Sequence, residues 1–325
     1  MRVALFSSQK YERAFFTEAV TAYPHIEITH FEHALTMETV YLASGFDAVC
    51  VFVNDDANAC VLGELAELNV KFIVLRCAGF NNVDIDAAHA LGIQVVRVPA
   101  YSPEAVAEHC IALILTLARK THKAYNRVRE ENFDLNGLLG FNIHNKTVGV
   151  IGCGKIGQSL VSILNGFGAH TLVFDPNVGE GSYTKVSLQM LFEQSDIITL
   201  HCPLTESTQH LLNDDAFQKM KTGVMVINTS RGALIDTQAC IKALKSRKIG
   251  YLGLDVYEQE SELFFKDRSE DIIQDDDFIR LSGFPNVLIT GHQGFFTKEA
   301  LTEIASITIS NLNALDCGQA SPNSV

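Results

Sequence analysis

Three polar residues with complementary chemistry each follow an apolar, strand-like segment in the second half of the chain. Arg231 follows Val-Ile-Asn-Thr-Ser, Glu260 follows Asp-Val-Tyr-Glu-Gln, and His292 follows Leu-Ile-Thr-Gly. A guanidinium can bind a substrate carboxylate through two hydrogen bonds, and an imidazole can pass a proton to a carbonyl oxygen as hydride reaches the carbon. A carboxylate beside the imidazole fixes its tautomer and favours its protonated form. The three residue types therefore match the reduction of a carbonyl group.

A glycine-rich turn indicates the source of the hydride. Gly152, Gly154 and Gly157 form the spacing GxGxxG directly after the β-branched run Thr147–Ile151. The first glycine permits a tight turn, the second lets the backbone approach a pyrophosphate, and the third lets helix and strand pack closely. The helix that follows offers free N–H groups to the phosphates. Asp175 ends the next apolar run, about 20 residues on, where this pattern has a ribose-binding acid. The segment predicts a dinucleotide site.

Residues of these three types more often have a structural role than a catalytic one when each is considered alone. An arginine after a strand is usually a surface or ion-pairing residue, a glutamate in a charged loop is usually solvated, and a histidine can be a packing residue. Ligands of an open parallel sheet, however, bind beyond the carboxyl ends of its strands. The joint occurrence of Arg231, Glu260 and His292 at such ends, behind a dinucleotide motif, favours the catalytic interpretation.

Composition limits the remaining possibilities. With 325 residues, of which 47% are hydrophobic and 19% charged, the chain is long enough for two globular domains. A net charge of −13 argues against a nucleic-acid partner. No apolar run is long enough to cross a bilayer, and the N-terminus has no signal-peptide pattern, which predicts a cytoplasmic protein without a membrane partner. The eight cysteines form no CxxC pair, so we expect buried free thiols, no disulfides and no metal site.

The first hundred residues alternate between strand-like and helix-like segments, which indicates a parallel sheet. The expected strands are Val3–Phe6, Ile26–Phe31, Ala48–Val53 and Phe72–Leu75, and the expected helices are Lys10–Thr21 and Ala59–Leu68. Ser102-Pro103-Glu104 is a strong helix start, and the pattern predicts one long connecting helix from there to about Glu131.

A second series of strands and helices begins at Thr147 and predicts a doubly wound sheet. Its expected strands are Thr147–Ile151, Thr171–Phe174, Ile197–Leu200, Val224–Asn228, Leu252–Asp255 and Val287–Ile289. The acidic stretch Asp267–Asp277 is interpreted as a solvated loop. The tail from Lys298 to Leu315 predicts one more helix, long enough to return to the first domain.

These segments together resemble the D-2-hydroxyacid dehydrogenase family, and most of all its fermentative D-lactate dehydrogenases. The resemblance is carried by motifs spread over most of the chain: Arg76-Cys-Ala-Gly-Phe-Asn-Asn-Val-Asp84, Val98-Pro-Ala-Tyr-Ser-Pro-Glu-Ala-Val-Ala-Glu108-His109, Gly152–Gly157, His201-Cys-Pro-Leu-Thr205, Asn228-Thr-Ser-Arg-Gly-Ala-Leu-Ile-Asp236, Asp255-Val-Tyr-Glu and Gly291-His-Gln. It implies an α/β fold of two doubly wound parallel-sheet domains, a Rossmann nucleotide-binding domain and a flavodoxin-like substrate domain. The nucleotide domain would comprise residues 101–297, and the discontinuous substrate domain residues 1–100 and 298–325.

The resemblance also implies roles for individual residues. Arg231 would anchor the substrate carboxylate, His292 would act as the acid/base and Glu260 as its partner. Further substrate contacts would come from Ala78, Gly79, Tyr101, Phe52 and Phe296. The remaining cofactor contacts would come from Lys155, Ile156, Asp175, His201, Cys202, Pro203, Thr208, Thr229, Ser230, Asp255, Arg231 and His292. Asp255 would hold the nicotinamide carboxamide.

The activity implied is the NAD-dependent reduction of pyruvate to D-lactate by a homodimer, or a homotetramer, assembled through the nucleotide-binding domain. Two alternatives stay open. One is reduction of a bulkier, branched or aromatic 2-oxo acid. The other, from a different functional class, is a corepressor-like scaffold that binds NAD. The family's formate dehydrogenases are disfavoured, because they have Gln where this chain has Glu260.

Overall fold

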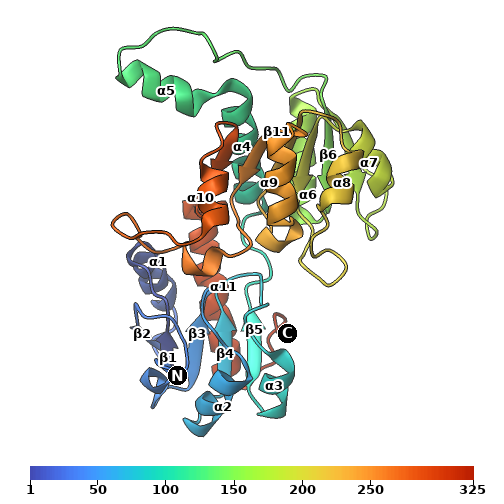
Figure 1. Cartoon of the computed structure of the whole chain (residues 1–325). Helices are drawn as coiled ribbons and strands as arrows, with labels where there is room; N and C mark the ends of the chain where they lie inside the picture. Colours follow the sequence, from blue (N-terminus) through green and yellow to red (C-terminus); the bar gives the residue numbers. More distant parts are fainter. The chain divides into compact units, whose positions relative to one another are not determined.

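The computed structural model describes the backbone of residues 1–325 and their side chains, except that of residue 262. The chain divides into two compact units. The first unit combines Met1–Ser102 with Phe296–Val325, and the second unit is Pro103–Phe295. Both chain termini belong to the first unit (Figure 1). Each unit is built on one parallel sheet flanked by helices, which confirms the predicted fold class.

The first unit contains a five-stranded sheet of order β2-β1-β3-β4-β5. Its strands are β1 (Arg2–Leu5), β2 (Glu27–His30), β3 (Ala48–Val51), β4 (Phe72–Leu75) and β5 (Gln94–Arg97). Its helices are α1 (Lys10–Val20), α2 (Ala59–Glu67), α3 (Ile85–Ala90) and α11 (Lys298–Asp316), with the 3₁₀ turn η1 (Val40–Ala43). The apolar face of α11, which includes Ala305, Ile309 and Leu312, is buried against Val3 and Val74 of this sheet. Burial of that face attaches the C-terminal segment to the N-terminal unit.

The second unit contains a seven-stranded parallel sheet of order β12-β11-β10-β9-β6-β7-β8. Its strands are β6 (Thr147–Ile151), β7 (His170–Phe174), β8 (Thr184–Lys185), β9 (Ile197–Leu200), β10 (Val224–Asn228), β11 (Ile249–Leu254) and β12 (Val287–Ile289). Helices α4 (Pro103–Arg119) and α6 (Lys155–Gly166) pack on one face of the sheet. The opposite face is covered by α7 (Leu188–Gln194), α8 (Asp214–Lys219), α9 (Thr237–Lys245) and α10 (Asp276–Ser282). The strand order reverses between β6 and β9, so ligands are expected beyond the carboxyl ends of these strands.

One predicted helix is wrong in length. The connector expected to run from Pro103 to about Glu131 is two helices, α4 and α5 (Thr121–Arg129), separated by Lys120 in the left-handed conformation with φ 54°. The carbonyl oxygen of Ala118 accepts a 3.2 Å hydrogen bond from the N–H of Phe141 instead of continuing the helical ladder. A tertiary contact between residues 118 and 141, which are 23 positions apart, therefore ends α4, and helical periodicity alone does not reveal such a contact.

The acidic stretch is also not wholly a loop. Asp275 accepts hydrogen bonds from the backbone N–H of Phe278 and from the hydroxyl of Tyr257, at 2.9 Å and 2.8 Å, and thereby begins α10.

The eight cysteines are free thiols, but Cys60 and Cys317 are exposed rather than buried. In the part of the chain that the structure describes, none of the helices combines the length and apolar character that crossing a membrane requires.

Candidate active site

His292 and Glu260 form a hydrogen-bonded pair in the second unit. The Nδ1 atom of His292 lies 2.7 Å from Oε1 of Glu260, and the two side chains are only 18% and 23% exposed. The other carboxylate oxygen, Oε2, accepts a hydrogen bond of 2.9 Å from the backbone N–H of Tyr257. Because the carboxylate accepts at Nδ1, that nitrogen carries a proton, and Nε2 is the ring atom that remains to act on a substrate oxygen.

The backbone of His292 adopts a rare conformation, with φ 53°. A non-glycine residue in this region is strained unless its surroundings hold it there, and such strain concentrates at functional sites. The carbonyl oxygen of Asp255 accepts from the N–H of His292 at 2.7 Å. The carboxylate of Asp255 accepts from the N–H groups of Gln293 and Gly294, at 2.9 Å and 2.7 Å. Asp255 thus holds the turn that presents the imidazole.

The same carboxylate is fully engaged with its neighbours. Asp255 is 1% exposed, and its Oδ1 also accepts from the Thr290 hydroxyl at 2.5 Å and lies 3.1 Å from Nε2 of His109. Burial alone would raise the pKa of Asp255, but the hydrogen bonds from His109 and Thr290 outweigh burial and keep the pKa below its usual value. The family resemblance implies that Asp255 contacts the nicotinamide, whereas its support of the His292 turn is visible only in the folded chain.

Replacement of Asp255 by Asn should weaken both the turn and the fold. An amide offers one acceptor oxygen in place of two, so a donor of Gln293 or Gly294 faces an NH₂ group, at an expected cost of about 1–3 kcal/mol. The folded pKa of the aspartate lies below its unfolded value of about 3.9, so its contribution is complete above that value and is lost as the pH falls through the folded pKa. Chemical denaturation should show wild type more stable than D255N at pH 7 and a shrinking difference below about pH 4. A difference that does not change with pH would contradict this role of the carboxylate.

Two phenylalanine rings lie beside the imidazole. The ring centroid of Phe265 is 5.6 Å from that of His292, and the buried Phe295 lies at 6.5 Å in an edge-to-face arrangement. Apolar rings on two sides of the pair limit the access of water to it. Phe265 was not among the predicted site residues, because an aromatic residue in a charged loop carries no periodic signal.

Arg231 follows β10, the strand beside β11. The side chain of Asn228 fixes this turn: its Nδ2 donates to the carbonyl oxygen of Arg231 at 2.8 Å, and its Oδ1 accepts from the N–H of Ser230 at 3.0 Å. Gly232 is required next, because a Cβ atom there would lie 2.0 Å from the backbone of Tyr257. This close approach joins the turn of Arg231 to the segment that leads to Glu260. Arg231, Glu260 and His292 thus follow three neighbouring strands, β10, β11 and β12, at one edge of the sheet.

The glycine turn after β6 has the features that a dinucleotide requires. Gly152 has φ +89°, and a Cβ atom on it would lie 2.5 Å from the backbone N of Cys202. A Cβ on Gly157 would lie 2.3 Å from the carbonyl oxygen of Gly152, so only glycine allows α6 to pack this closely. Gly154 precedes α6 and has open space where its Cβ would be, which leaves the backbone accessible to a pyrophosphate. Lys155 and Ile156 form the first turn of that helix.

Asp175 follows β7 and contacts the same turn. Its Oδ2 accepts from the N–H of Cys153 at 2.7 Å, and its Oδ1 accepts from the N–H of Asn177 at 2.8 Å. The carboxylate is half-buried at the end of the strand, where the fingerprint has the ribose-binding acid. Asp175 therefore has two roles available to it, support of the glycine turn and binding of a ribose.

Two polar side chains at the ends of β9 and β10, His201 and Thr229, lack hydrogen-bond partners among the described residues. Both ring nitrogens of His201 and the hydroxyl of Thr229 are buried without a hydrogen bond within the described part of the chain. Burial lowers the pKa of His201 to about 4, so the ring is neutral. Buried polar groups are rarely left unpaired, so these atoms fit a bound ligand that supplies the partners. Together with the glycine turn, they fit a dinucleotide.

The other predicted cofactor residues lie in neighbouring loops. Cys202 and Pro203 follow β9, and the carbonyl oxygen of Cys202 accepts from the hydroxyl of Ser230 at 2.7 Å. The Thr208 hydroxyl donates to the carbonyl oxygen of Pro203 at 2.7 Å and so shapes the loop after that strand. These contacts make the loop a single hydrogen-bonded unit beside the glycine turn.

The predicted substrate residues belong to the first unit. Phe52, one residue past β3, is 8% exposed, and the guanidinium of Arg76 lies 5.0 Å from its ring centroid. Arg76 is itself buried and ion-paired with Glu12 at 3.0 Å. Phe296 is 48% exposed and packs edge-on against Tyr11, with centroids 4.6 Å apart. Phe52 is therefore a packed side chain, whereas Phe296 presents much of its surface.

The turn after β4 contains the remaining candidates. The carbonyl oxygen of Ala78 accepts from the guanidinium of Arg97 at 2.6 Å, and that of Gly79 accepts from the thiol of Cys77 at 3.2 Å. With these carbonyl groups engaged, the N–H groups of the turn are the atoms suited to an anion. Tyr101, partly exposed, lies at the end of this unit's first segment.

Comparison with known proteins identifies the class to which this fold and site belong. The family model of the D-isomer specific 2-hydroxyacid dehydrogenase, NAD binding domain, matches residues 111–294. The chain therefore belongs to the D-2-hydroxyacid dehydrogenase family of NAD-dependent oxidoreductases. It is similar to a D-lactate dehydrogenase of Escherichia coli, with 54% identity over 99% of each chain.

Solved structures agree with this assignment. The apo structure of D-lactate dehydrogenase from Escherichia coli matches with a TM-score of 0.91 at 50% identity, over 100% of both chains. A structure described as the pyruvate reductase of Chlamydomonas reinhardtii matches with a TM-score of 0.93 at 43% identity, over 99% of this chain and 98% of that one. The D-lactate dehydrogenase from Aquifex aeolicus complexed with NAD and lactic acid matches with a TM-score of 0.88 at 32% identity, over 99% and 98% of the two chains.

Proposed function

We propose that this protein reduces pyruvate to D-lactate with NADH. The observation that carries the proposal is the pair of His292 and Glu260, aligned with Arg231 at the ends of three neighbouring strands beside the glycine turn. Full-length similarity to D-lactate dehydrogenases supports it. The direct test is oxidation of NADH by the purified protein when pyruvate is added. A corepressor-like scaffold would bind NADH without turnover, and that result would overturn the proposal.

The proposed mechanism assigns one task to each residue. When bound, the reduced nicotinamide supplies the hydride that reaches the carbonyl carbon. Arg231 binds the carboxylate of pyruvate through two hydrogen bonds and so orients the carbonyl group. The Nε2 atom of His292 donates the proton that the carbonyl oxygen takes up, and Glu260 fixes the ring by accepting from Nδ1. In lactate oxidation the same nitrogen accepts the proton.

We further propose that Asp175 determines the preference for NADH over NADPH. Its carboxylate would accept hydrogen bonds from ribose hydroxyls and repel a 2′-phosphate. D175N should raise kcat/KM for NADPH relative to that for NADH, because the charge is lost while an acceptor for the N–H of Cys153 remains. D175A serves as the control, since it loses that acceptor and should also weaken NADH binding. If the unmodified protein uses both cofactors equally, Asp175 is not the determinant.

Substrate size is proposed to depend on the aromatic residues of the first unit, Phe52 and Tyr101, with Phe296 and the Ala78-Gly79 turn as further contacts. We expect kcat/KM to fall from pyruvate to 2-oxo-4-methylpentanoate and phenylpyruvate, because a filled apolar pocket rejects larger groups through overpacking. F52L should narrow or invert this order. Since the Phe52 ring also packs against Arg76, the thermal stability of F52L should be measured in parallel. A preference of the unmodified enzyme for phenylpyruvate would replace pyruvate with the bulkier substrate class.

We also propose a cytoplasmic homodimer assembled through the second unit, or a tetramer of such dimers. The segment after α4 exposes apolar side chains that a partner would bury: Tyr125, Val128, Phe133, Leu135 and Leu139, which are 55–87% exposed. Light scattering on the purified protein measures its mass in solution, and a monomer at micromolar concentration would contradict this proposal.

A further inference from the structure

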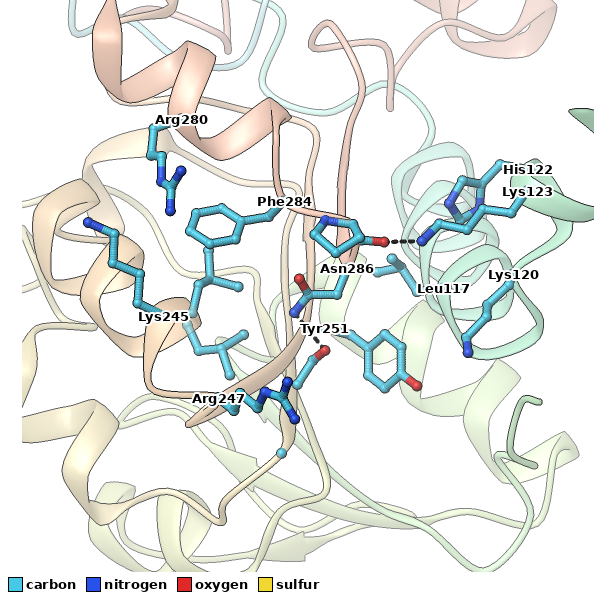
Figure 2. A pocket seen from close by; sticks show the side chains of 15 residues that line it. Leu117, Lys120, His122, Lys123, Lys245, Arg247, Tyr251, Arg280, Phe284 and Asn286 are labelled. Atoms are coloured by element: carbon cyan, nitrogen blue, oxygen red, sulfur yellow. Dashed lines mark hydrogen bonds between the residues drawn. The ribbon is translucent and has the colours of Figure 1, made fainter. Parts of the chain in front are cut away.

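A cavity of about 740 Å³ lies in the second unit at the amino ends of β10, β11 and β12. Three segments surround it: the junction of α4 and α5, the turn between α9 and β11, and the loop between α10 and β12 (Figure 2). Its lining residues are Leu117, Lys120, His122, Lys123, Gly223, Leu244, Lys245, Arg247, Ile249, Gly250, Tyr251, Arg280, Phe284, Pro285 and Asn286. The proposed active site is at the opposite, carboxyl ends of the same strands. The six residues of β11 alone span about 20 Å.

The charged side chains that line this cavity are all positive. Five of its lining side chains are cations and none is a carboxylate, although the chain as a whole has a net charge of −13. The cations are Lys120, Lys123, Lys245, Arg247 and Arg280. Figure 2 shows Lys245 and Arg280 on one side of Tyr251 and Asn286, and Lys120 and Lys123 on the other. Such a concentration of positive charge in an acidic protein indicates an anionic ligand.

The described neighbours of these cations compensate their charges only in part. Among the described side chains, none of the five forms an ion pair. Lys120 and Lys123 donate to the carbonyl oxygens of Gly137 and Pro285, and Arg280 stacks on Phe284 with its guanidinium carbon 4.7 Å from the ring centroid. Carbonyl groups and an aromatic face compensate only part of a full charge. The described side chains thus place five like charges around one cavity without an ion pair to any of them.

The like charges affect one another. Burial lowers the pKa of Lys123, and the nearby charges of Lys120 and Arg127 lower it further. A bound anion would favour the charged ammonium of Lys123 and so oppose the lowering of its pKa by the neighbouring cations. The volume of the cavity also falls within the range of about 300–1,000 Å³ in which small ligands bind. Size and charge together select a compact molecule with several negative groups.

We propose that this cavity binds a small polyanion carrying two or more phosphate or carboxylate groups. The planar guanidinium groups of Arg247 and Arg280 can each donate two parallel hydrogen bonds to the oxygen atoms of a phosphate or of a carboxylate. The lysine ammonium groups add positive charge. The hydroxyl of Tyr251 and the amide of Asn286, between the two groups of cations, can bind the centre of such a ligand. The site is distinct from the dinucleotide site and does not depend on the identity of the 2-oxo acid.

The test is a binding titration on the enzyme saturated with NADH, so that the glycine turn is already occupied. Inorganic pyrophosphate and propane-1,2,3-tricarboxylate are titrated separately by calorimetry at constant ionic strength, with acetate as the monoanion control. The two probes distinguish a phosphate site from a carboxylate site. The variant R247Q/R280Q removes two cations of the cavity, and K219Q/K248Q removes two cations of the same unit that do not line it.

We expect saturable binding of at least one probe to the unmodified enzyme, one per chain. R247Q/R280Q should weaken it by about 10-fold or more, because hydrogen bonds to charged groups are lost, and K219Q/K248Q should change it by less than about 2-fold. Thermal melting and NADH turnover of both variants check that they remain folded and active. Absence of binding by both probes, or equal weakening in the two variants, would overturn the proposal.

Discussion

His292→Ala is expected to reduce kcat for pyruvate reduction by about 10³-fold, within the range that general acid catalysis contributes. The substitution removes the only group of the His292–Glu260 pair that can donate a proton to the carbonyl oxygen, and it leaves Glu260 hydrogen-bonded to the backbone of Tyr257. Steady-state kinetics with NADH and pyruvate give the size of the loss. Titration of NADH by fluorescence shows whether the variant still binds the cofactor.

The matched control is Glu260→Gln, which keeps the shape of the side chain. The carboxylate accepts two hydrogen bonds, from His292 and from Tyr257, whereas an amide can accept at only one of these positions. Turnover should therefore fall, but by less than in H292A. An H292A variant with more than about a tenth of normal kcat would contradict the role of His292 as proton donor, because a general acid contributes at least 10²-fold.

Arg231→Lys is expected to lower kcat/KM by about 10²-fold or more, although the positive charge is kept. An ammonium cannot form the two parallel hydrogen bonds of a guanidinium to a planar carboxylate, and misorientation of the carbonyl group alone can cause a loss of this size. The side chain of Asn228 shapes the turn by donating to the carbonyl oxygen of Arg231 and accepting from the N–H of Ser230, and these bonds do not involve the Arg231 side chain. The guanidinium itself donates to the carbonyl oxygen of Ser230 at 2.7 Å, a bond that an ammonium can replace, so the variant should remain folded.

A rescue experiment separates loss of the anchor from loss of the fold. In Arg231→Ala, added guanidinium ion should restore part of the turnover, and ethylammonium of equal charge should restore less. Near-normal kcat/KM in R231K, or equal rescue by the two cations, would mean that Arg231 does not act as a two-pronged anchor.

Much of the fold follows from local patterns. β4, β6, β9, β10 and β12 have the predicted bounds, because an apolar run between turn residues is sufficient to specify a buried parallel strand. The short strands β5 and β8 and the helix α3 were not predicted, since each has little apolar periodicity. The break at Lys120 depends on the contact of Ala118 with Phe141, which is tertiary. Asp275 was assigned to a loop because it lies in an acidic stretch, although the bond by which it caps α10, from the N–H of Phe278, is local.

The candidate site also contains features that local sequence patterns predict and features that depend on tertiary contacts. The glycine turn and the three strand ends could be predicted, because spacing and residue type carry the chemistry. The support of the His292 turn could not, since it depends on contacts of Asp255 with His109 and Thr290 that converge only in the folded chain. The packing of Phe265 on His292 was missed for the same reason. The cationic cavity draws residues from three segments that are far apart in the sequence, so it exists as one site only in the folded chain.

Analysis of the product formed from pyruvate and NADH tests the central claim most directly. The purified enzyme is incubated with both compounds, NADH consumption is followed to completion, and the lactate is resolved by chiral chromatography. We expect one D-lactate for each NADH oxidised, and product formation by H292A that is slower by about 10³-fold. Formation of L-lactate, or oxidation of NADH without stoichiometric lactate, would contradict it.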